Sequence, residues 1–129
     1  MDTERSPQSL DDVRLAILRQ HTQLGQALDE LEANADAVLA KGGSGDALRR
    51  SLDALETRFL RHIEYEDSLG AATKALLGDH VDKRTRMRGL VHDRDVFGDP
   101  CGLAREARVL VHAFRRDIAE EAARLRMLA

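Results

Sequence analysis

Two pairs of ionisable residues in this sequence have helical spacing. His62 and Glu66 lie four residues apart, and Asp117 and Glu121 do so as well. Residues four apart in an α-helix lie one above the other on a single face. Each pair continues or borders a row of apolar residues, so both pairs are predicted to point toward the interior of a helical fold. One imidazole and three carboxylates placed there are suitable ligands for a metal ion.

Two single histidines extend this pattern. His21 lies in the apolar row of a helical segment that precedes both pairs. His80 lies in the apolar row of the segment between the two pairs. Counted from the ends of their segments, these residues lie at similar depths, so antiparallel helices would bring them into one layer. Burying an ionisable group costs several kcal/mol unless it is paired or bound to a metal. We therefore predict a metal site whose candidate ligands are His21, His62, Glu66, His80, Asp117 and Glu121.

The predicted ligand set mixes imidazole nitrogens with carboxylate oxygens. Such a set suits first-row metals such as iron or manganese. Carboxylates such as Glu66 can also bridge two ions, which offsets the repulsion between them. The single cysteine, Cys101, lies outside the rows that contain the ligands, which argues against a cysteine-rich structural zinc site.

Simpler interpretations of the same residues stay open from the sequence. His62 and Glu66 can form an ordinary salt bridge within one helix, and His21 alone can be a core histidine with satisfied hydrogen bonds. Asp117 and Glu121 can be surface charges close to arginines. The metal site is favoured because four segments each place such a residue on the inward face at compatible depth.

Four segments of the chain have the periodicity of amphipathic helices. They cover residues 9–41, 46–69, 76–90 and 99–128. The break between the second and third segments is poorly defined. Short connections between four helices predict an all-α fold, an antiparallel up-down-up-down four-helix bundle. The apolar rows of the first, second and fourth segments are formed mainly by Ile17, Leu24, Leu31, Val38, Leu48, Leu52, Leu55, Phe59, Leu103, Ala107, Leu110 and Phe114.

Start and stop signals mark the ends of these segments. The run of glycines after Lys41 predicts the end of the first helix, because glycine readily adopts the positive φ angles of a turn. Asp46 is a candidate N-cap of the second helix. Asp99 followed by Pro100 predicts the start of the last helix, since proline is favoured at the first helical position.

Composition is that of one helical domain. We expect residues 9–129 to form it and residues 1–8 to be a flexible N-terminal arm. Aromatic residues make up only 3% of the chain and its net charge is -3, so neither nucleic acid nor an anionic membrane is an expected partner. The polar start, the lack of a long apolar run and the single cysteine predict a cytoplasmic protein, a monomer or weak homodimer.

The order of these motifs resembles the hemerythrin-like (HHE cation-binding) family. The resemblance covers about residues 15–128. It depends on the histidine that ends Ile17–His21, on His62 to Glu66 followed by an aspartate, on Asp79-His80, and on Asp117 to Glu121. It implies a hemerythrin-like four-helix bundle that binds two non-haem iron ions, with manganese or zinc less favoured. It also implies that the six candidate ligands hold these ions.

Two departures from the family's oxygen carriers affect the expected function. Those proteins have a second histidine four residues from the one on the third helix, whereas here Leu76 and Arg84 flank His80 at that spacing. They also use a histidine on the last helix that lies five residues before an aspartate. His112 and Asp117 have this spacing. His112 points away from the apolar row, so Asp117 and Glu121 are preferred and His112 is kept as an alternative.

A site rich in carboxylates favours the higher oxidation state of iron, which disfavours bulk oxygen carriage. With these departures, the resemblance implies a non-haem diiron protein that binds or reacts with dioxygen, peroxide or nitric oxide. Tyr65, next to Glu66, is either a redox group near the metals or an ordinary tyrosine on a helix face. The alternatives are an iron storage or sensing module without turnover, and a metal-free helical interaction domain. Whether the protein is an enzyme is left open.

Overall fold

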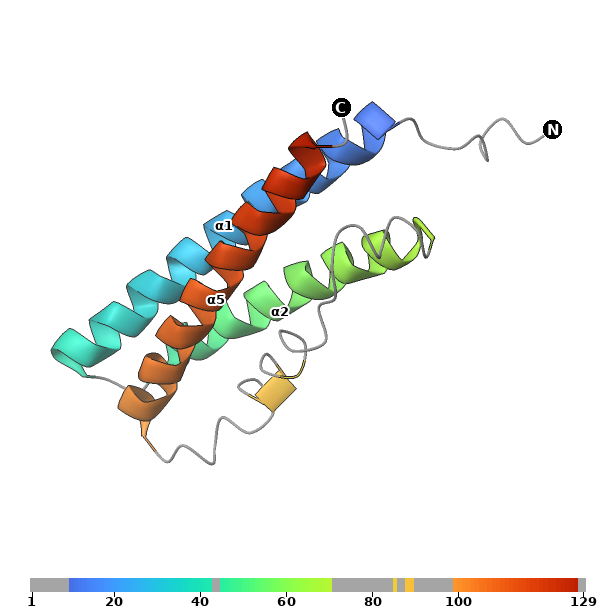
Figure 1. Ribbon diagram of the computed structural model, residues 1–129. Coiled ribbons are helices and arrows are strands. Elements are labelled where there is room, and N and C mark those ends of the chain that lie inside the picture. The colour runs from blue at the N-terminus through green and yellow to red at the C-terminus, as the bar shows by residue number, and fades with distance from the viewer. Residues whose placement is uncertain (1–9, 43–44, 71–84, 86–87, 90–98, 128–129) are drawn as a thin grey trace.

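Three long α-helices form the described part of the fold (Figure 1). The computed structural model describes residues 10–42, 45–70, 85, 88–89 and 99–127. The helices are α1 (Leu10–Lys41), α2 (Asp46–Asp67) and α5 (Pro100–Arg126), and these residues contain no strand. α1 packs against both α2 and α5 and runs antiparallel to them. The predicted all-α class is confirmed.

The predicted helix over residues 76–90 lies outside the described residues, except for Thr85, Arg88 and Gly89. These three residues are helical. The up-down-up-down arrangement of four helices therefore stays a prediction. The predicted arm at residues 1–8 also lies outside the described part of the chain.

The predicted C-terminal end of α1 and the predicted start of α5 are confirmed. α1 ends at Lys41 and is followed by Gly42, whose φ angle is 77° and whose N–H donates to the carbonyl of Val38 at 2.8 Å. This left-handed glycine satisfies a carbonyl that the helix end would otherwise leave without a partner. At the start of α5, Oδ1 of Asp99 accepts a hydrogen bond from the N–H of Gly102 at 2.7 Å, and Pro100 follows as predicted.

The prediction that Asp46 caps α2 is wrong. The N-cap residue is Gly45, with φ 79° and no hydrogen bond from a capping side chain, and Asp46 is the first residue of the helix. The short turn requires a left-handed residue at this point, which glycine adopts at little steric cost. Asp46 instead adds negative charge to the first helical turn, where it complements the helix dipole, and lies 3.6 Å from Arg49.

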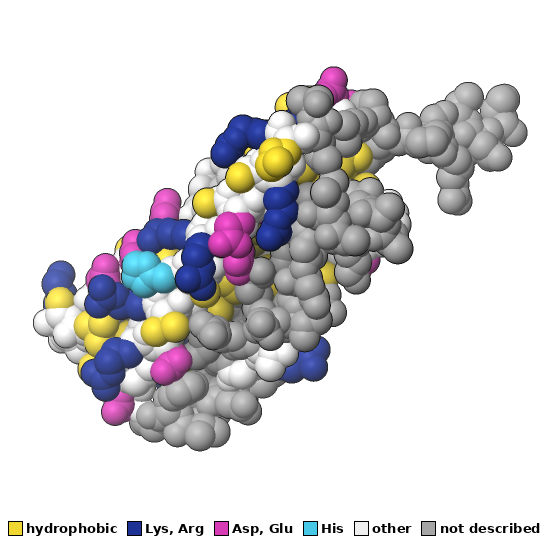
Figure 2. All heavy atoms as spheres, viewed as in Figure 1, with side chains coloured by type: hydrophobic (Ala, Val, Ile, Leu, Met, Phe, Trp, Pro, Cys, Tyr) yellow, Lys and Arg dark blue, Asp and Glu magenta, His cyan; other side chains and the backbone are white. Residues whose placement is uncertain are grey.

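Buried side chains follow the predicted apolar rows of all three helices. Each helix is amphipathic, and Figure 2 shows Lys, Arg, Asp and Glu side chains over the described part of the visible face. None of the described helices is long and apolar enough to span a membrane. The rings of Phe59 and Phe114 pack with centroids 4.9 Å apart between α2 and α5. Burying one leucine or phenylalanine side chain contributes roughly 1.5–3 kcal/mol. These rows therefore supply the main stabilising contacts of the three-helix unit.

A polar layer divides this core into two parts. The main apolar cluster runs from Val38 to Leu24 along α1 and ends at Phe59, Ile63 and Phe114 on the other helices. The smaller apolar cluster consists of Ile17 and Leu125, with Val13, Tyr65 and Leu69 packed against it. Between the two clusters lie the buried polar residues His21, His62, Glu66 and Glu121.

Replacing Gly45 with alanine should destabilise the fold more than the same change at Gly42. Both glycines have positive φ angles, 79° and 77°, so each alanine incurs the cost of a left-handed conformation, roughly 1–2 kcal/mol. A Cβ at Gly45 would also lie 3.1 Å from Cβ of Pro100, whereas one at Gly42 meets nothing within 4 Å. Free energies of unfolding in urea measure the difference. Equal losses would contradict the close packing of this turn on the start of α5.

Candidate metal centre

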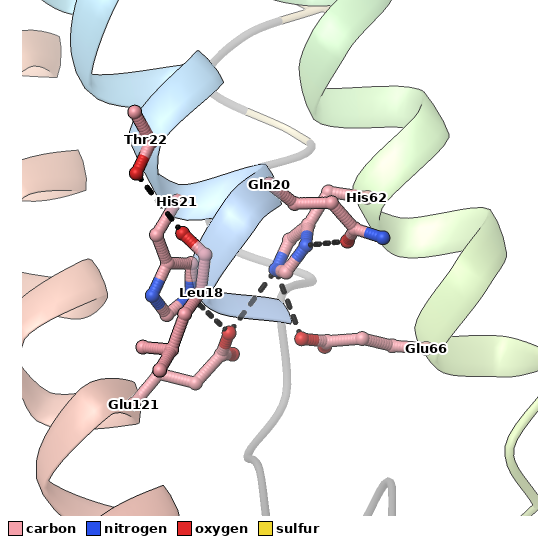
Figure 3. Close-up of polar contacts among 7 residues, drawn as sticks. All are labelled: Leu18, Gln20, His21, Thr22, His62, Glu66 and Glu121. Atoms are coloured by element: carbon pink, nitrogen blue, oxygen red, sulfur yellow. Dashed lines mark hydrogen bonds and ion pairs between the residues drawn. The ribbon is translucent and has the colours of Figure 1, made fainter. Parts of the chain in front are cut away.

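Three helices place ionisable side chains in one buried layer (Figure 3). His21 comes from α1, His62 and Glu66 come from α2, and Glu121 comes from α5. Their exposed fractions are 7%, 3%, 1% and 3%, respectively. The predicted inward orientation of these four side chains is therefore confirmed.

One carboxylate oxygen of Glu121 lies between the two imidazole rings. Nε2 of His21 donates to Oε1 of Glu121 at 2.6 Å, and Nε2 of His62 lies 3.1 Å from the same oxygen. Nε2 of His62 also lies 2.9 Å from Oε2 of Glu66. The centroids of the two rings are 5.5 Å apart. The Nε2 atoms of both histidines thus face carboxylate oxygens (Figure 3).

The carboxylates favour the protonated form of His62. Burial is the largest single influence and lowers the pKa of His62, but the hydrogen bonds and negative charges of Glu121 and Glu66 together outweigh it. The pKa of His62 is raised from 6.5 to about 9. Without a metal ion, a protonated His62 therefore offsets part of the negative charge buried in this layer.

The same atoms have the spacing of ligands around one metal ion. One donor atom each from His21, His62 and Glu121 lies within 4.8 Å of the other two. Donors about 2.1 Å from one ion lie about 3.0 Å apart when their bonds meet at right angles. The distances of 3.1 Å and 2.9 Å at Nε2 of His62 are compatible with this spacing and are also ordinary hydrogen-bond lengths, and the 2.6 Å contact of His21 is a hydrogen bond. This buried group can hold a metal ion.

A small cavity adjoins the buried group. Its volume is about 20 Å³ for the centre of a water-sized sphere, which is room for one water molecule or ion. The cavity is lined by the three grouped residues and by Leu24, Phe59, Phe114, Asp117 and Ile118. Nδ1 of His21 is buried and has no hydrogen-bond partner among the described residues. A buried polar atom of this kind is normally satisfied by a ligand or an ordered water.

The other predicted candidates occupy different positions. Asp117 is half-buried and lines the cavity, one helical turn before Glu121. His80 lies outside the described residues. His112, the alternative ligand, is exposed on α5, as its position off the apolar row predicts. Tyr65 is partly buried against the smaller apolar cluster. The described geometry thus brings together His21, His62, Glu66 and Glu121.

Gln20 contacts this layer and was not among the predicted residues. Its Oε1 accepts a hydrogen bond from Nδ1 of His62 at 2.6 Å (Figure 3). Gln20 directly precedes His21, so its side chain leaves α1 about 100° around the helix axis from that of His21. The spacing of a glutamine does not identify it as a site residue, because glutamine is common at solvent-facing positions of helices. The only available signal was its position next to a predicted ligand.

Comparison with known proteins finds no matching protein family, no matching curated protein and no matching solved structure. The site is therefore interpreted from its own chemistry.

Replacing Glu121 should weaken metal binding far more than replacing Asp117. Glu121 contacts both histidines, and Asp117 lines the adjoining cavity. Glu121→Gln should reduce metal affinity by more than the roughly 10- to 100-fold that is typical for residues that contact a ligand rather than the metal itself. Asp117→Asn should reduce it by less. Titration with ferrous iron under anaerobic conditions, in competition with a coloured chelator, measures both. A larger loss for Asp117→Asn would assign the α5 ligand to Asp117 instead.

The metal-free protein should lose stability as pH rises from 6.5 through about 9. The folded-state pKa of His62 is raised to about 9 from 6.5, so its stabilising contribution is complete below pH 6.5 and is lost above the folded-state pKa. The contribution is on the order of 3 kcal/mol. Unfolding in urea after chelator treatment, repeated across this pH range, measures it. His62→Gln should abolish the decline and His112→Gln should keep it; a decline that survives in His62→Gln would assign it to another group.

Proposed function

We propose that this protein binds non-haem iron and uses it to bind or react with a small molecule: dioxygen, peroxide or nitric oxide. The observation that supports this is the convergence of His21, His62 and Glu121 from three helices at one buried point. Exposed clusters of this kind are common on protein surfaces. A buried one is costly unless its charges are balanced, and a bound cation balances them.

The donor set supports iron among the first-row metals. Two imidazoles and one carboxylate, with remaining positions open, form the ligand set of many non-haem ferrous iron sites. The grouped residues include no thiolate, which is the ligand expected of a closed structural zinc site. Manganese and zinc accept the same atoms and rank below iron in this proposal.

A second ion is part of the proposal. Glu66 supplies an oxygen 2.9 Å from Nε2 of His62, and Asp117 lines the adjoining cavity. Both carboxylates therefore border the first site, and in this proposal they supply ligands to the second ion. His80 lies outside the described residues. In this proposal it would be the ligand from a fourth helix. This arrangement would be a hemerythrin-like four-helix bundle with a diiron centre.

The residues around the site have three separate tasks. His21, His62 and Glu121 would hold the ion, and the apolar side chains of the cavity would limit access by water. The adjoining cavity has room for one water-sized molecule or ion. When bound, iron would supply the redox chemistry and a Lewis-acidic position for that molecule.

Two other functions stay as alternatives. An iron storage or sensing module would bind the metal without turnover, with the stability of the fold rising on metal binding. A metal-free helical interaction domain is favoured by one observation: His62, when protonated, already pairs with Glu121 and Glu66 without any ion. Metal content distinguishes the metal-free interaction domain from the two iron-binding functions. Turnover with peroxide distinguishes the reactive iron protein from the storage or sensing module.

The protein purified from iron-replete cells should contain about two irons per chain. Absorption bands in the near ultraviolet, from charge transfer between oxygen ligands and iron, should accompany them. His62→Ala should abolish both, because His62 contacts both carboxylates of the layer. His112→Ala is the matched control: this exposed histidine on α5 should leave the iron content unchanged.

Each possible iron content has a different meaning. One iron per chain would support the site of His21, His62 and Glu121 and remove the second ion from the proposal. No stoichiometric metal, even after anaerobic reconstitution with ferrous iron, would overturn the proposal and leave the metal-free interaction domain.

A further inference from the structure

Both ring nitrogens of His62 have close polar neighbours. Nε2 faces the carboxylate oxygens of Glu121 and Glu66, at 3.1 Å and 2.9 Å. Nδ1 lies on the opposite side of the ring, 2.6 Å from Oε1 of Gln20 (Figure 3). Gln20 and His21 are consecutive on α1, so the same turn of this helix contacts the candidate site at two points.

Metal binding through Nε2 requires a particular tautomer of His62. A neutral imidazole has one N–H and one lone pair, and the lone pair must lie on the nitrogen that binds the metal. The proton then has to be on Nδ1. Oε1 of Gln20 is a hydrogen-bond acceptor, so it stabilises a proton at Nδ1 and keeps Nε2 available.

We propose that Gln20 is a positioning residue of the metal centre, which fixes the tautomer and the ring orientation of His62. This inference rests on the proposed function and goes beyond the ligands themselves. Gln20 does not contact the metal position; it acts through the Nδ1–H of His62. Partners of this kind orient a histidine ligand and set its basicity.

The chemical type of this partner also affects the metal. A carboxylate at the same place would add negative charge beside the imidazole and make it a stronger donor. The amide of Gln20 is neutral, so it orients His62 without adding to the charges of Glu66 and Glu121. Gln20→Glu should therefore favour ferric over ferrous iron, because added negative charge stabilises the more positive ion.

Three variants test this inference. Gln20→Met keeps the length of the side chain but removes the acceptor, and Gln20→Glu keeps an acceptor and adds charge. Gln23→Met is the matched control, because Gln23 is an exposed glutamine on the same helix. Zinc serves as a probe without redox chemistry, and its affinity is measured by competition with a chelator. Gln20→Met should bind zinc roughly 10- to 100-fold more weakly than wild type, while Gln20→Glu and Gln23→Met should not bind it more weakly.

Two further measurements separate positioning from a general effect on folding. In the zinc-loaded wild type, ¹⁵N NMR of the His62 ring should show Nε2 bound to zinc and a slowly exchanging proton on Nδ1. Gln20→Met should lose the slow exchange of that proton. In the iron-loaded protein, Gln20→Glu should lower the midpoint potential more than Gln23→Glu does, because only the first change places the added charge against the His62 ring.

Two results would overturn the inference while the proposed metal function stands. One is a wild type and a Gln20→Met variant that bind zinc with equal affinity. The other is a His62 ring that binds zinc through Nδ1 and has its proton on Nε2. A wild type that binds neither zinc nor iron would overturn the metal function and the positioning role together, so the two failures are distinguishable.

Discussion

The structure depends on balancing ionisable side chains inside an apolar core. Two imidazoles and two carboxylates lie there with at most 7% of their surface exposed, and each would be costly to bury alone. The contacts that offset this cost cross between helices: His21 of α1 with Glu121 of α5, and His62 of α2 with Glu121 and Gln20. We infer that the polar layer selects one register of the three helices, since a shift of one turn would separate these partners.

The two apolar clusters supply stability that offsets the cost of burying the ionisable side chains of this layer. The main cluster packs against one side of the layer and the smaller cluster against the other. A further contact between α1 and α5 lies outside the core, where the guanidinium of Arg115 binds Glu32 at 3.0 Å and Asp29 at 2.8 Å. Such partly exposed ion pairs contribute up to about 1 kcal/mol. The Arg115 contact therefore mainly helps to fix how α1 and α5 align.

A proton and a metal ion would compete for the same atoms in this layer. With a proton on Nε2, His62 donates to the carboxylate of Glu121 and forms an ion pair with Glu66. With a cation there, the same nitrogen and oxygens would become ligands. Either occupant offsets the buried negative charge. Metal affinity in such a site is linked to pH and to the stability of the fold, because binding releases the proton.

The sequence by itself determined the three helices α1, α2 and α5 and their inward faces. Periodicity identified His62 and Glu66 as buried, and the signals at Gly42 and Asp99 located two helix ends, because these features depend only on residues close in the chain. Only the tertiary structure decided which groups meet. Asp117 and Glu121 differ by about 40° around α5, so the one that contacts the histidines depends on how that helix is rotated. The contact of Gln20 with His62 likewise depends on the packing of α1 against α2, which no spacing within one helix specifies.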